Sequence, residues 1–337
     1  MRNSRWGILS TAGIAQKAVL PALQAADCCD SVALASRNSE RAKSVAQSFD
    51  IPTTYDSYEA LLADPDIDVI YNPLPNHLHV PMTLKALEAG KHVLCEKPLA
   101  LSLAEAKLVV ETAQRTGKYV AEAFMTRHHP QWQRAKALID AGRIGKLTAV
   151  QALFSYTNTD PDNVRNQSDI GGGGLNDIGC YALDTARFFF SSNPVAVSAA
   201  MDRDPNFGTD RLTTGTARFA CGGHLSFTVA TQSALAQHLI LLGTQGYLIL
   251  DAPFNCPEDH AARLSIDNGT DILAGGREVE ILSPCDQYRA QVECFSEHIR
   301  NGSPMPASFD DIIGNAAALE HITRAAETGR WETLDHF

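Results

Sequence analysis

The stretch Gly90-Lys91-His92-Val93-Leu94-Cys95-Glu96-Lys97-Pro98 joins a short apolar run to a charged turn. A glycine ahead of the run is typical of a helix C-terminus, and four mostly apolar residues are typical of a buried strand. A helical pattern at 78–89 precedes the stretch and another at 103–116 follows it, as in a β–α–β unit. The sequence therefore predicts that Lys97 lies just past the end of a buried parallel strand.

The first third of the chain repeats this alternation of strand and helix. Right-handed crossovers between such strands give a doubly wound, Rossmann-type α/β sheet, which binds ligands at the carboxyl ends of its strands. Ser57 and Ser102 precede two of the helical patterns and are the residue type that caps helix N-termini. The other predicted strands are 6–9, 32–35, 69–71 and 119–122, and the other predicted helices are 14–25, 39–49 and 58–63.

The alternation stops after residue 123. A helical pattern at 132–141 leads to a long predicted strand at 148–156, and later strand-like runs follow without helices between them, which predicts an α+β domain with a mostly antiparallel sheet. We therefore predict an NADP-binding Rossmann domain at 1–123 and a substrate-binding domain at 124–337. Its final helix, near 310–328, is a candidate to pack back on the first domain. The later runs are 195–202, 211–219, 225–231, 238–242 and 247–251.

The composition is that of a soluble globular protein, with 45% hydrophobic and 20% charged residues among 337. A net charge of -11 without a lysine or arginine block argues against nucleic acid as the main partner. No apolar run approaches the ~18 residues of a membrane helix, and the first strand begins at Trp6, so we expect neither a membrane anchor nor a secretory leader. The 8 cysteines lack metal-ligand spacing, which predicts no metal site and a cytoplasmic location.

The loop after the first predicted strand, Ser10-Thr11-Ala12-Gly13-Ile14-Ala15, stands where dinucleotide-binding folds carry G-x-G-x-x-G/A. Those glycines let backbone N–H groups approach the pyrophosphate at a helix N-terminus. Ser10 and Ala12 replace the first two glycines, but small residues still permit a close approach and a serine hydroxyl can bond a phosphate. Because this loop lies in the first β–α–β unit of the series, we interpret it as a cofactor-binding loop and not as an ordinary strand–turn–helix connection.

The end of the second predicted strand indicates which cofactor is used. An acidic residue there accepts the ribose hydroxyls of NAD, whereas cations favour the 2′-phosphate of NADP. Asp30 precedes the strand, at its wrong end, and the strand instead runs into Ser36 and Arg37, with Arg41 one helical turn later. Two arginines can clamp a phosphate by charge-assisted bonds, or they can be two solvated residues at a helix start. We predict NADP, with NAD as the alternative.

The second informative stretch is Gly171 to Tyr181, which reads G-G-G-G-L-N-D-I-G-C-Y. On a helix that starts after the glycines, Asp177, Tyr181 and Asp184 share one face. The glycines leave no side-chain bulk where the helix N-terminus would meet a ligand. Lowering the phenol pKa from about 10 to near 7 needs roughly 4 kcal/mol, and a neighbouring ammonium such as that of Lys97 can supply it. In isolation, such a tyrosine is also an ordinary half-buried core residue.

Three stretches together resemble one family, Gfo/Idh/MocA: Gly90 to Ala100, Tyr71 to His79, and Gly171 to Tyr181. Within it, the stretch from Ala121 to Pro130 is similar to the branch of NADP-dependent aldose (D-xylose) dehydrogenases and dimeric trans-dihydrodiol dehydrogenases. The resemblance implies a Rossmann domain, an open-faced sheet domain that commonly mediates dimers, and a catalytic pair that here corresponds to Lys97 and Tyr181. It also suggests a cis bond between Lys97 and Pro98.

The remaining candidate residues fall into two groups. One group lies at strand ends near the expected cofactor and comprises Pro73, Leu74, Asn76, His77 and Glu96, with His79 as a residue that packs. The other group consists of candidates for the substrate cleft and comprises Arg127, His128, Phe154, Arg165, Asp177 and Tyr181. Arg127 and His128 are equally compatible with a hinge or interface role. Phe154, together with Tyr156 and Phe254, is a candidate for a pocket wall against a sugar or ring and is equally compatible with ordinary sheet packing.

These features predict an oxidoreductase that moves hydride between NADP and the carbinol carbon of a sugar or cyclic polyol. In this scheme Tyr181 takes the hydroxyl proton with help from Lys97, and Asp177 orients the substrate or the lysine. Three alternatives stay open at this point: trans-dihydrodiol dehydrogenase activity, a non-catalytic NADP-dependent sensor, and a lyase or glycosidase that oxidises its substrate transiently.

Overall fold

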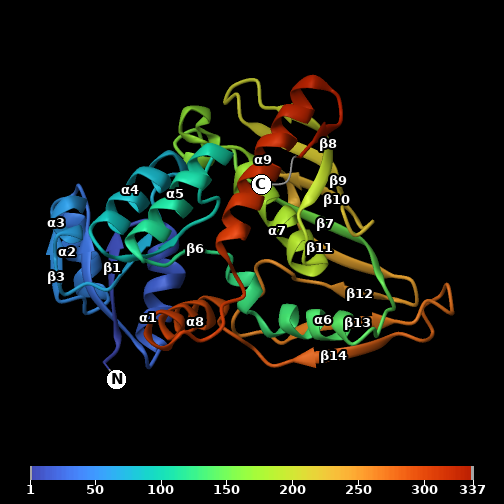
Figure 1. Cartoon of the computed structure of the whole chain (residues 1–337), viewed down its shortest axis with the longest axis horizontal. Helices are drawn as coiled ribbons and strands as arrows, with labels where there is room; N and C mark the ends of the chain where they lie inside the picture. Colours follow the sequence, from blue (N-terminus) through green and yellow to red (C-terminus); the bar gives the residue numbers. More distant parts are fainter. Residues whose placement is uncertain (1, 335–337) are drawn as a thin grey trace. The chain divides into compact units, whose positions relative to one another are not determined.

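The computed structural model describes residues 2–334, which form two compact units (Figure 1). Unit 1 contains the chain up to His128 together with Asp286–Ile313. Unit 2 contains His129–Cys285 and the chain from Gly314 onward. The boundary thus lies after residue 128 where we expected it after 123, and the predicted second domain, 124–337, is interrupted by a segment that belongs to unit 1.

Unit 1 is built on a six-stranded parallel sheet with the order β3-β2-β1-β4-β5-β6. The chain starts in the middle, moves to one edge, and then returns to fill the other edge. This change of direction places helices on both faces of the sheet, which confirms the predicted doubly wound fold. The strands are β1 (Ser4–Leu9), β2 (Cys29–Ala35), β3 (Thr53–Tyr55), β4 (Val69–Asn72), β5 (His92–Cys95) and β6 (Val120–Glu122).

The helices of unit 1 follow the predicted pattern with small shifts. The predicted helix at 14–25 is observed as a π-helical turn, η1 (Ala15–Val19), that continues into α1 (Leu20–Ala25). Ser57 and Ser102 cap helices as predicted, because their hydroxyls accept from the backbone N–H of Ala60 and Glu105. The other helices are α2 (Ser39–Ser48), α3 (Tyr58–Leu62), α4 (Asn76–Glu88), α5 (Leu103–Thr116) and η2 (Met125–His128).

The late segment of unit 1 completes its hydrophobic core. This segment begins with α8 (Gln287–Asn301), which the sequence pattern did not predict. Phe295 is fully buried, with its ring centroid 5.6 Å from that of Trp6, and the Trp6 indole donates to the Ser296 hydroxyl at 3.1 Å. Residues of α1, α2 and α8 share one apolar cluster with β1 and β2, whereas α4 and α5 pack together on the other face (Figure 1).

Unit 2 is built on a nine-stranded sheet with the order β14-β13-β12-β11-β7-β10-β9-β8-β15. Only β7 and β10 pair in parallel among the strands described, so the prediction of a mostly antiparallel sheet is confirmed. The strands are β7 (Leu147–Thr157), β8 (Pro194–Arg203), β9 (Asp210–Phe219), β10 (His224–Ala230), β11 (Gln232–Gly243), β12 (Tyr247–Leu250), β13 (Ala262–Asp267), β14 (Glu278–Leu282) and β15 (Glu332–Thr333).

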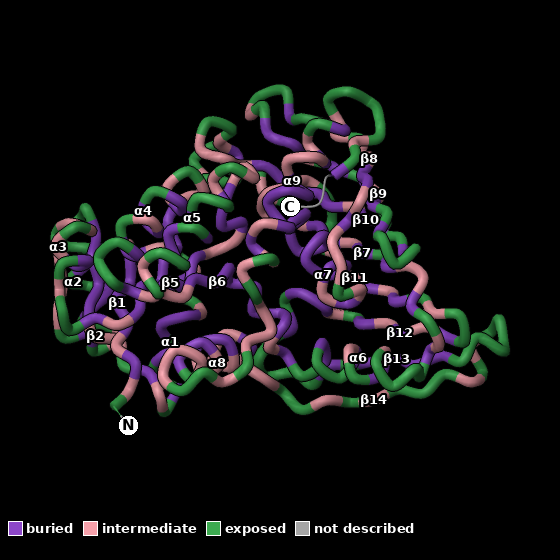
Figure 2. The backbone as a smooth tube through the Cα atoms, viewed as in Figure 1, coloured by how far each residue is buried: buried purple, intermediate pink, exposed green. Residues whose placement is uncertain are grey.

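The two faces of this sheet differ in burial. One face is covered by helices and is formed by buried side chains such as Ala152, Leu239 and Phe227. The opposite face stays partly exposed, and buried and exposed positions alternate along its strands (Figure 2). The helices of unit 2 are α6 (Pro130–Asp140), η3 (Val164–Asn166), η4 (Ser168–Ile170), η5 (Leu175–Gly179), α7 (Cys180–Phe190) and α9 (Phe309–Thr328), whose first residues belong to unit 1.

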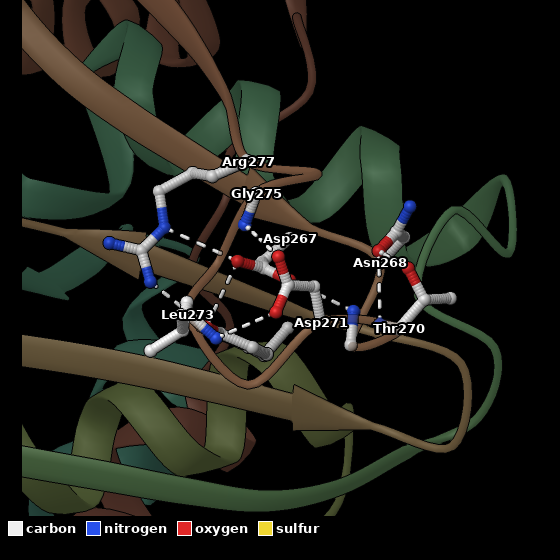
Figure 3. A network of polar contacts seen from close by, with 9 residues as sticks. Asp267, Asn268, Thr270, Asp271, Leu273, Gly275 and Arg277 are labelled. Atoms are coloured by element: carbon white, nitrogen blue, oxygen red, sulfur yellow. Dashed lines mark hydrogen bonds and ion pairs between the residues drawn. The ribbon is translucent and has the colours of Figure 1, made fainter.

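The β13–β14 hairpin is an element that we did not predict from the sequence. Short polar side chains order its turn: Asp267 accepts from the N–H of Gly269, and Asp271 accepts from those of Leu273 and Gly275 (Figure 3). Arg277 closes the base with an Nε–Oδ2 distance of 3.3 Å to Asp267. The strands alternate in the sequence, as Ala262-Arg263-Leu264-Ser265-Ile266-Asp267 and Glu278-Val279-Glu280-Ile281, so a strand signal was present that our prediction did not use.

Candidate active site

The carboxyl ends of four parallel strands gather the candidate cofactor residues of unit 1. Leu9 at the end of β1 pairs with Ala35 at the end of β2, and Asn72 at the end of β4 pairs with Cys95 at the end of β5. The segments that follow these strands therefore leave from one edge of the sheet, where ligands bind in such folds. These segments contain Ser10, Thr11, Ala12, Gly13, Ile14, Ser36, Arg37, Pro73, Leu74, Asn76, His77, Glu96 and Lys97.

The loop after β1 has the space that a phosphate needs. Ser10 adopts a positive φ of 71°, and its hydroxyl accepts from the N–H of Ala12 at 3.2 Å. A Cβ placed on Gly13 would meet no atom within 4 Å. The helix that follows offers the free N–H groups of its first turn. The loop therefore fits a pyrophosphate group although it lacks two of the usual glycines.

The segment after β2 is basic. Arg41, on the first turn of α2, donates to the carbonyl of Thr11 at 3.3 Å, which ties it to the loop after β1. Neither Arg37 nor Arg41 forms an ion pair with a carboxylate in residues 2–334. Asp30 lies at the start of β2, as expected from the sequence, and accepts from Asn3. The segment from Ser36 to Arg41 thus presents two guanidinium groups, and its one acid, Glu40, pairs with Lys43, which suits a 2′-phosphate.

The turn that carries Lys97 is fixed by its neighbours. The Glu96 carboxylate accepts from the Tyr71 hydroxyl at 2.7 Å and from the Lys97 N–H at 3.3 Å, so it ties the turn to β4. The bond between Lys97 and Pro98 is cis, as the resemblance suggested. The Leu99 N–H donates to the buried carboxylate of Glu122, at the end of β6, at 2.9 Å. The backbone on both sides of Lys97 is therefore held by two neighbouring strands.

His79 connects this turn to the segment after β4. Its Nδ1 lies 2.8 Å from the carbonyl oxygen of Pro98 and its Nε2 lies 2.6 Å from that of Leu74. Burial lowers the pKa of His79 to about 4, although the two carbonyl bonds act against this change. His79 packs between two cofactor-edge segments, as the sequence suggested. Asn72, which the sequence reasoning missed, assists by donating to the carbonyl of His79.

In unit 2, Asp177 is the centre of a small polar network. Its Oδ2 accepts from the Tyr156 hydroxyl at 2.5 Å and from Arg165 Nε at 2.9 Å, and its side chain is 13% exposed. Burial and then the Asp177 charge raise the pKa of Tyr156 above its ordinary value, so this phenol stays protonated and donates. Tyr156 was predicted only as part of an aromatic wall with Phe154, which lies two residues earlier on the same strand face, and its bond to Asp177 was not predicted.

Tyr181 lies in an aromatic group one helical turn after Asp177. Its ring centroid is 5.8 Å from that of Phe154 and 5.6 Å from that of Phe254, and the latter two rings are stacked 4.9 Å apart. Tyr181 and Phe154 are 5% and 4% exposed. The segment from Leu175 to Gly179 is π-helical, a form that is frequent at functional sites. The helix thus sets a tyrosine into an apolar wall close to a fixed carboxylate.

The four glycines before this helix are explained by protein contacts. A Cβ on Gly172 would lie 2.6 Å from the carbonyl oxygens of Arg165 and Gln167, and one on Gly173 would lie 2.1 Å from Asp210 Oδ1. The expectation that they leave room for a ligand is therefore corrected for these two positions, because backbone and a carboxylate already fill that room. Asp210, which the sequence reasoning missed, accepts from the Leu175 N–H at 2.7 Å.

Arg127 and His129, on either side of His128, form hydrogen bonds with other groups of the protein. Arg127 is 3% exposed and donates to Asp311 at 2.9 Å and to the Pro306 carbonyl at 2.6 Å, within unit 1. His128 ends η2, and His129 caps α6 by accepting from the Gln131 N–H. These contacts favour the hinge or packing role for Arg127, and its contact with substrate stays a prediction, as does that of His128.

Other classes of site are not found in the part of the chain that the structure describes. No group of three or more histidine, cysteine, aspartate or glutamate residues is placed to hold a metal ion. Over the same residues, no helix has the length and apolar character to cross a membrane.

Comparison with known families is decisive for the classification. Residues 4–124 match the oxidoreductase family with an NAD-binding Rossmann fold, Gfo/Idh/MocA, and residues 132–249 match the Gfo/Idh/MocA C-terminal domain. The chain belongs to this family. The resemblance drawn from the sequence is therefore confirmed, and the chain is a member of an oxidoreductase family.

Several members of the Gfo/Idh/MocA family are similar along nearly the whole chain. D-xylose 1-dehydrogenase (NADP(+)) 2 of Haloferax volcanii is 36% identical over 98% of this chain and 99% of its own. Bovine trans-1,2-dihydrobenzene-1,2-diol dehydrogenase is 33% identical over 95% and 96%. The 3-ketoreductase KijD10 of Actinomadura kijaniata, solved with NADP and TDP-benzene, has a TM-score of 0.89 at 28% identity over 96% and 98%. Its structures include a tyrosine-to-phenylalanine and a lysine-to-alanine variant.

The Gfo/Idh/MocA chain thus holds its candidate residues in two separate groups. The cofactor group and Lys97 belong to unit 1, whereas Phe154, Arg165, Asp177 and Tyr181 belong to unit 2. Each group is internally ordered by the contacts given above.

Proposed function

We propose that this protein is an NADP-dependent oxidoreductase that moves hydride between the nicotinamide and a carbinol or carbonyl carbon of a sugar or another cyclic polyol. The observation that carries the proposal is the arrangement around Asp177, where a fixed carboxylate precedes Tyr181 by one helical turn within an apolar wall. Relatives that act on sugars and on a dihydrodiol support the substrate class.

The cofactor in this proposal is NADP, held at the carboxyl edge of the unit 1 sheet. The loop after β1 would accept the pyrophosphate, and Arg37 and Arg41 would bind the 2′-phosphate by charge-assisted hydrogen bonds. When bound, the nicotinamide supplies or accepts the hydride. An arginine in place of an acid directly after β2 supports NADP over NAD.

The proton in this proposal moves through Tyr181. During oxidation its phenolate oxygen takes the proton of the substrate hydroxyl, and during reduction the phenol returns a proton to the carbonyl oxygen. The Lys97 ammonium stabilises the phenolate and donates a hydrogen bond to the substrate oxygen. The turn from Glu96 to Leu99 suits this role because neighbouring strands fix its backbone.

Asp177 and Arg165 orient the substrate in this scheme. Asp177 accepts from Tyr156 and Arg165, which fix its carboxylate, and a carboxylate is an acceptor for substrate hydroxyls. Arg165 is partly exposed, and guanidinium N–H groups donate to hydroxyl oxygens. A ring-shaped substrate would place its polar edge on these groups and its C–H face against Phe154 and Phe254. The same wall would accept a dihydrodiol, which is the second candidate substrate.

A substrate screen tests the proposal. The protein is incubated with NADP and a panel of aldoses, cyclic polyols and a trans-dihydrodiol, and reduced nicotinamide is followed by absorbance. We expect turnover with at least one member and with NADP preferred over NAD. Cofactor binding without turnover on any member would favour a sensor, and product elimination without net NADPH would favour a lyase.

Removing the two arginines that follow β2 is expected to weaken the binding of NADP and to leave that of NAD nearly unchanged. In the double variant Arg37→Ser/Arg41→Ala, we expect the KM for NADP to rise about a hundredfold or more, because charge-assisted hydrogen bonds are worth roughly 1.5–3 kcal/mol each and 1.4 kcal/mol is tenfold. The KM for NAD should change little. Lys43→Ala, on the same helix, is the control that removes a charge elsewhere on α2. An equal rise in the KM for both cofactors would mean that these arginines do not bind the 2′-phosphate.

We also propose that the protein forms a homodimer through the open face of the unit 2 sheet. The pairing register puts His238, Leu153, Thr228, Thr214 and Ala200 in one row across β11, β7, β10, β9 and β8. The row contains no lysine, arginine, aspartate or glutamate, and Leu242 on β11 stays 46% exposed on the same face. Flat rows of this kind suit burial against a second copy of the same surface.

A substitution that introduces one charge on this face tests the proposed dimer. Leu242→Arg is expected to weaken association about thirtyfold or more, because an anchor residue contributes roughly 2 kcal/mol or more and the variant buries a charge. Light scattering after size exclusion across a concentration series measures the change. Leu108→Arg on α5 is the matched control, since Leu108 is equally exposed at 47%. A monomer in the unaltered protein, or identical curves for both variants, would contradict the proposal.

A further inference from the structure

Unit 1 contains a shallow hollow that is open to solvent, called the cavity below, at the end of its sheet opposite the candidate cofactor residues. Its volume is about 320 Å³, at the small end of the range for ligand pockets. His92 is the first residue of β5, and Lys118 and Tyr119 lead into β6, so the cavity lies where these strands begin. His298 and Phe309, from the late segment of unit 1, complete its wall. The mechanism proposed above uses none of these residues.

In each of the two imidazoles of the cavity, the Nδ1 atom has a hydrogen-bond partner in the protein. The Nδ1 of His92 accepts from the Tyr119 N–H at 3.0 Å, so its Nε2 carries the proton and is a donor. The Nδ1 of His298 lies 2.7 Å from the carbonyl oxygen of Ser303 and therefore donates to it. Neither Nε2 has a protein partner within residues 2–334, and neither is fully buried. Both atoms are thus open to a ligand.

The charge of the cavity is positive. The Lys118 ammonium has no side-chain partner in the described part of the chain, and no aspartate or glutamate is among the lining residues. Burial and then the Lys118 charge lower the pKa of His92 to about 4, while Asp68 acts weakly in the other direction. The cation and the imidazole are therefore near enough to disfavour protonation of His92. An anion between them would bind the cation and accept from the His92 Nε2–H.

One wall of the cavity is aromatic and rigid. The ring of Tyr119 lies 4.2 Å from that of His298 and 5.7 Å from that of Phe309, with the Phe309 ring nearly parallel at 28°. The Tyr119 hydroxyl donates to the carbonyl of Ala307 at 2.9 Å, which fixes the ring in place. Aromatic walls of this kind favour flat, unsaturated ligands through stacked or edge contacts.

We propose that this cavity is a binding site for a small aromatic carboxylate. The carboxylate would accept from Lys118 Nζ and from His92 Nε2–H, and the ring would pack on the wall formed by Tyr119, His298 and Phe309. The site is separate from the candidate active site, because β5 carries His92 at its first residue and leads to Lys97 only past its other end.

The test is a titration of the full-length protein, saturated with NADP, with benzoate. Histidine-ring resonances are followed by NMR, and those of His92 and His298 are expected to shift in a saturable way. Cyclohexanecarboxylate, which has the same charge and no flat ring, should bind at least about fivefold more weakly. Inorganic phosphate serves as a probe for a charge-only site and should bind more weakly than benzoate.

Two variants make the test specific. Lys118→Met is expected to weaken benzoate binding about tenfold, or 1.4 kcal/mol. Lys107→Met removes an exposed charge from the preceding helix, α5, and should bind like the unaltered protein. Unchanged NMR spectra away from the cavity check that both variants fold.

Several outcomes would overturn the proposal. No saturable shift up to about 10 mM benzoate, where a site with a Kd of about 1 mM would be nearly full, would exclude the site. Equal affinity in Lys118→Met would exclude the proposed anion contact. Equal affinity for cyclohexanecarboxylate, or tighter binding of phosphate, would exclude an aromatic ligand. None of these outcomes bears on the oxidoreductase proposal, which the substrate screen tests separately.

Discussion

Replacing Tyr181 with phenylalanine is expected to lower kcat at least about a thousandfold, within the range that positioned acid–base groups contribute. The variant loses one hydroxyl and keeps the ring, so the contacts with Phe154 and Phe254 are preserved. The KM for NADP should stay within about twofold, because the candidate cofactor residues belong to the other unit. A large fall in kcat without a change in cofactor binding is the signature of a proton-transfer residue.

The measurement is steady-state kinetics on the best substrate from the screen, together with the binding of NADPH. Tyr247→Phe is the matched control, since Tyr247 is also in unit 2 and its hydroxyl bonds to Asp267 in the β13–β14 hairpin. That variant should keep its turnover. Turnover of Tyr181→Phe within about threefold of the unaltered protein would remove Tyr181 from the mechanism.

The second large effect is expected at Lys97. Lys97→Met keeps most of the stem and removes the ammonium, and we expect kcat to fall about a hundredfold or more, as when one preorganised donor is lost. The loss has two parts. The substrate oxygen loses a hydrogen-bond donor, and the phenolate loses the neighbouring cation that stabilises it.

The pH profile separates these two parts. In Lys97→Met the oxidation rate should begin to rise at a higher pH, closer to the ordinary phenol pKa of about 10. Lys107→Met serves as the charge-matched control and should keep both rate and profile. A reduced rate with an unmoved profile would mean that Lys97 binds substrate without assisting Tyr181.

The architecture of unit 1 could be predicted because each of its elements has a local signal. Buried parallel strands are continuous apolar runs, and helices between them begin at residues such as Ser57 and Ser102, whose hydroxyls do cap them. The strand β3 was missed because its three residues, Thr53–Tyr55, are only half buried and carry no apolar run.

The place of the late segment in unit 1 could not be predicted, for a different reason. Helix α8 has apolar residues at helical spacing, Tyr288, Val292, Phe295 and Ile299, but nothing within it indicates that Phe295 and Ser296 contact Trp6, almost 300 positions earlier. Contacts between distant parts of a chain depend on tertiary packing, which local propensity does not encode.

The positions of the candidate cofactor segments on the sheet were predicted, whereas the contacts that hold the candidate side chains in place were not. The loop after β1, the basic end of β2 and the turn at Lys97 were placed correctly at one edge of the sheet because parallel strands share that edge. The bond from Tyr156 to Asp177 and the contacts of Asp210 with the glycine stretch were not predicted, because these partners lie far apart in the sequence. Side chains that position others leave no motif of their own.

The discontinuity of unit 1 has a consequence for biosynthesis. As the chain leaves the ribosome, the first 128 residues appear long before Phe295. Trp6 and the apolar surfaces of β1, η1 and α1 therefore stay exposed to solvent until α8 has been synthesised. A nascent intermediate with that surface uncovered is a substrate for chaperones and prone to aggregate. Translation that stops early in the second unit would accordingly yield no stable nucleotide-binding fragment.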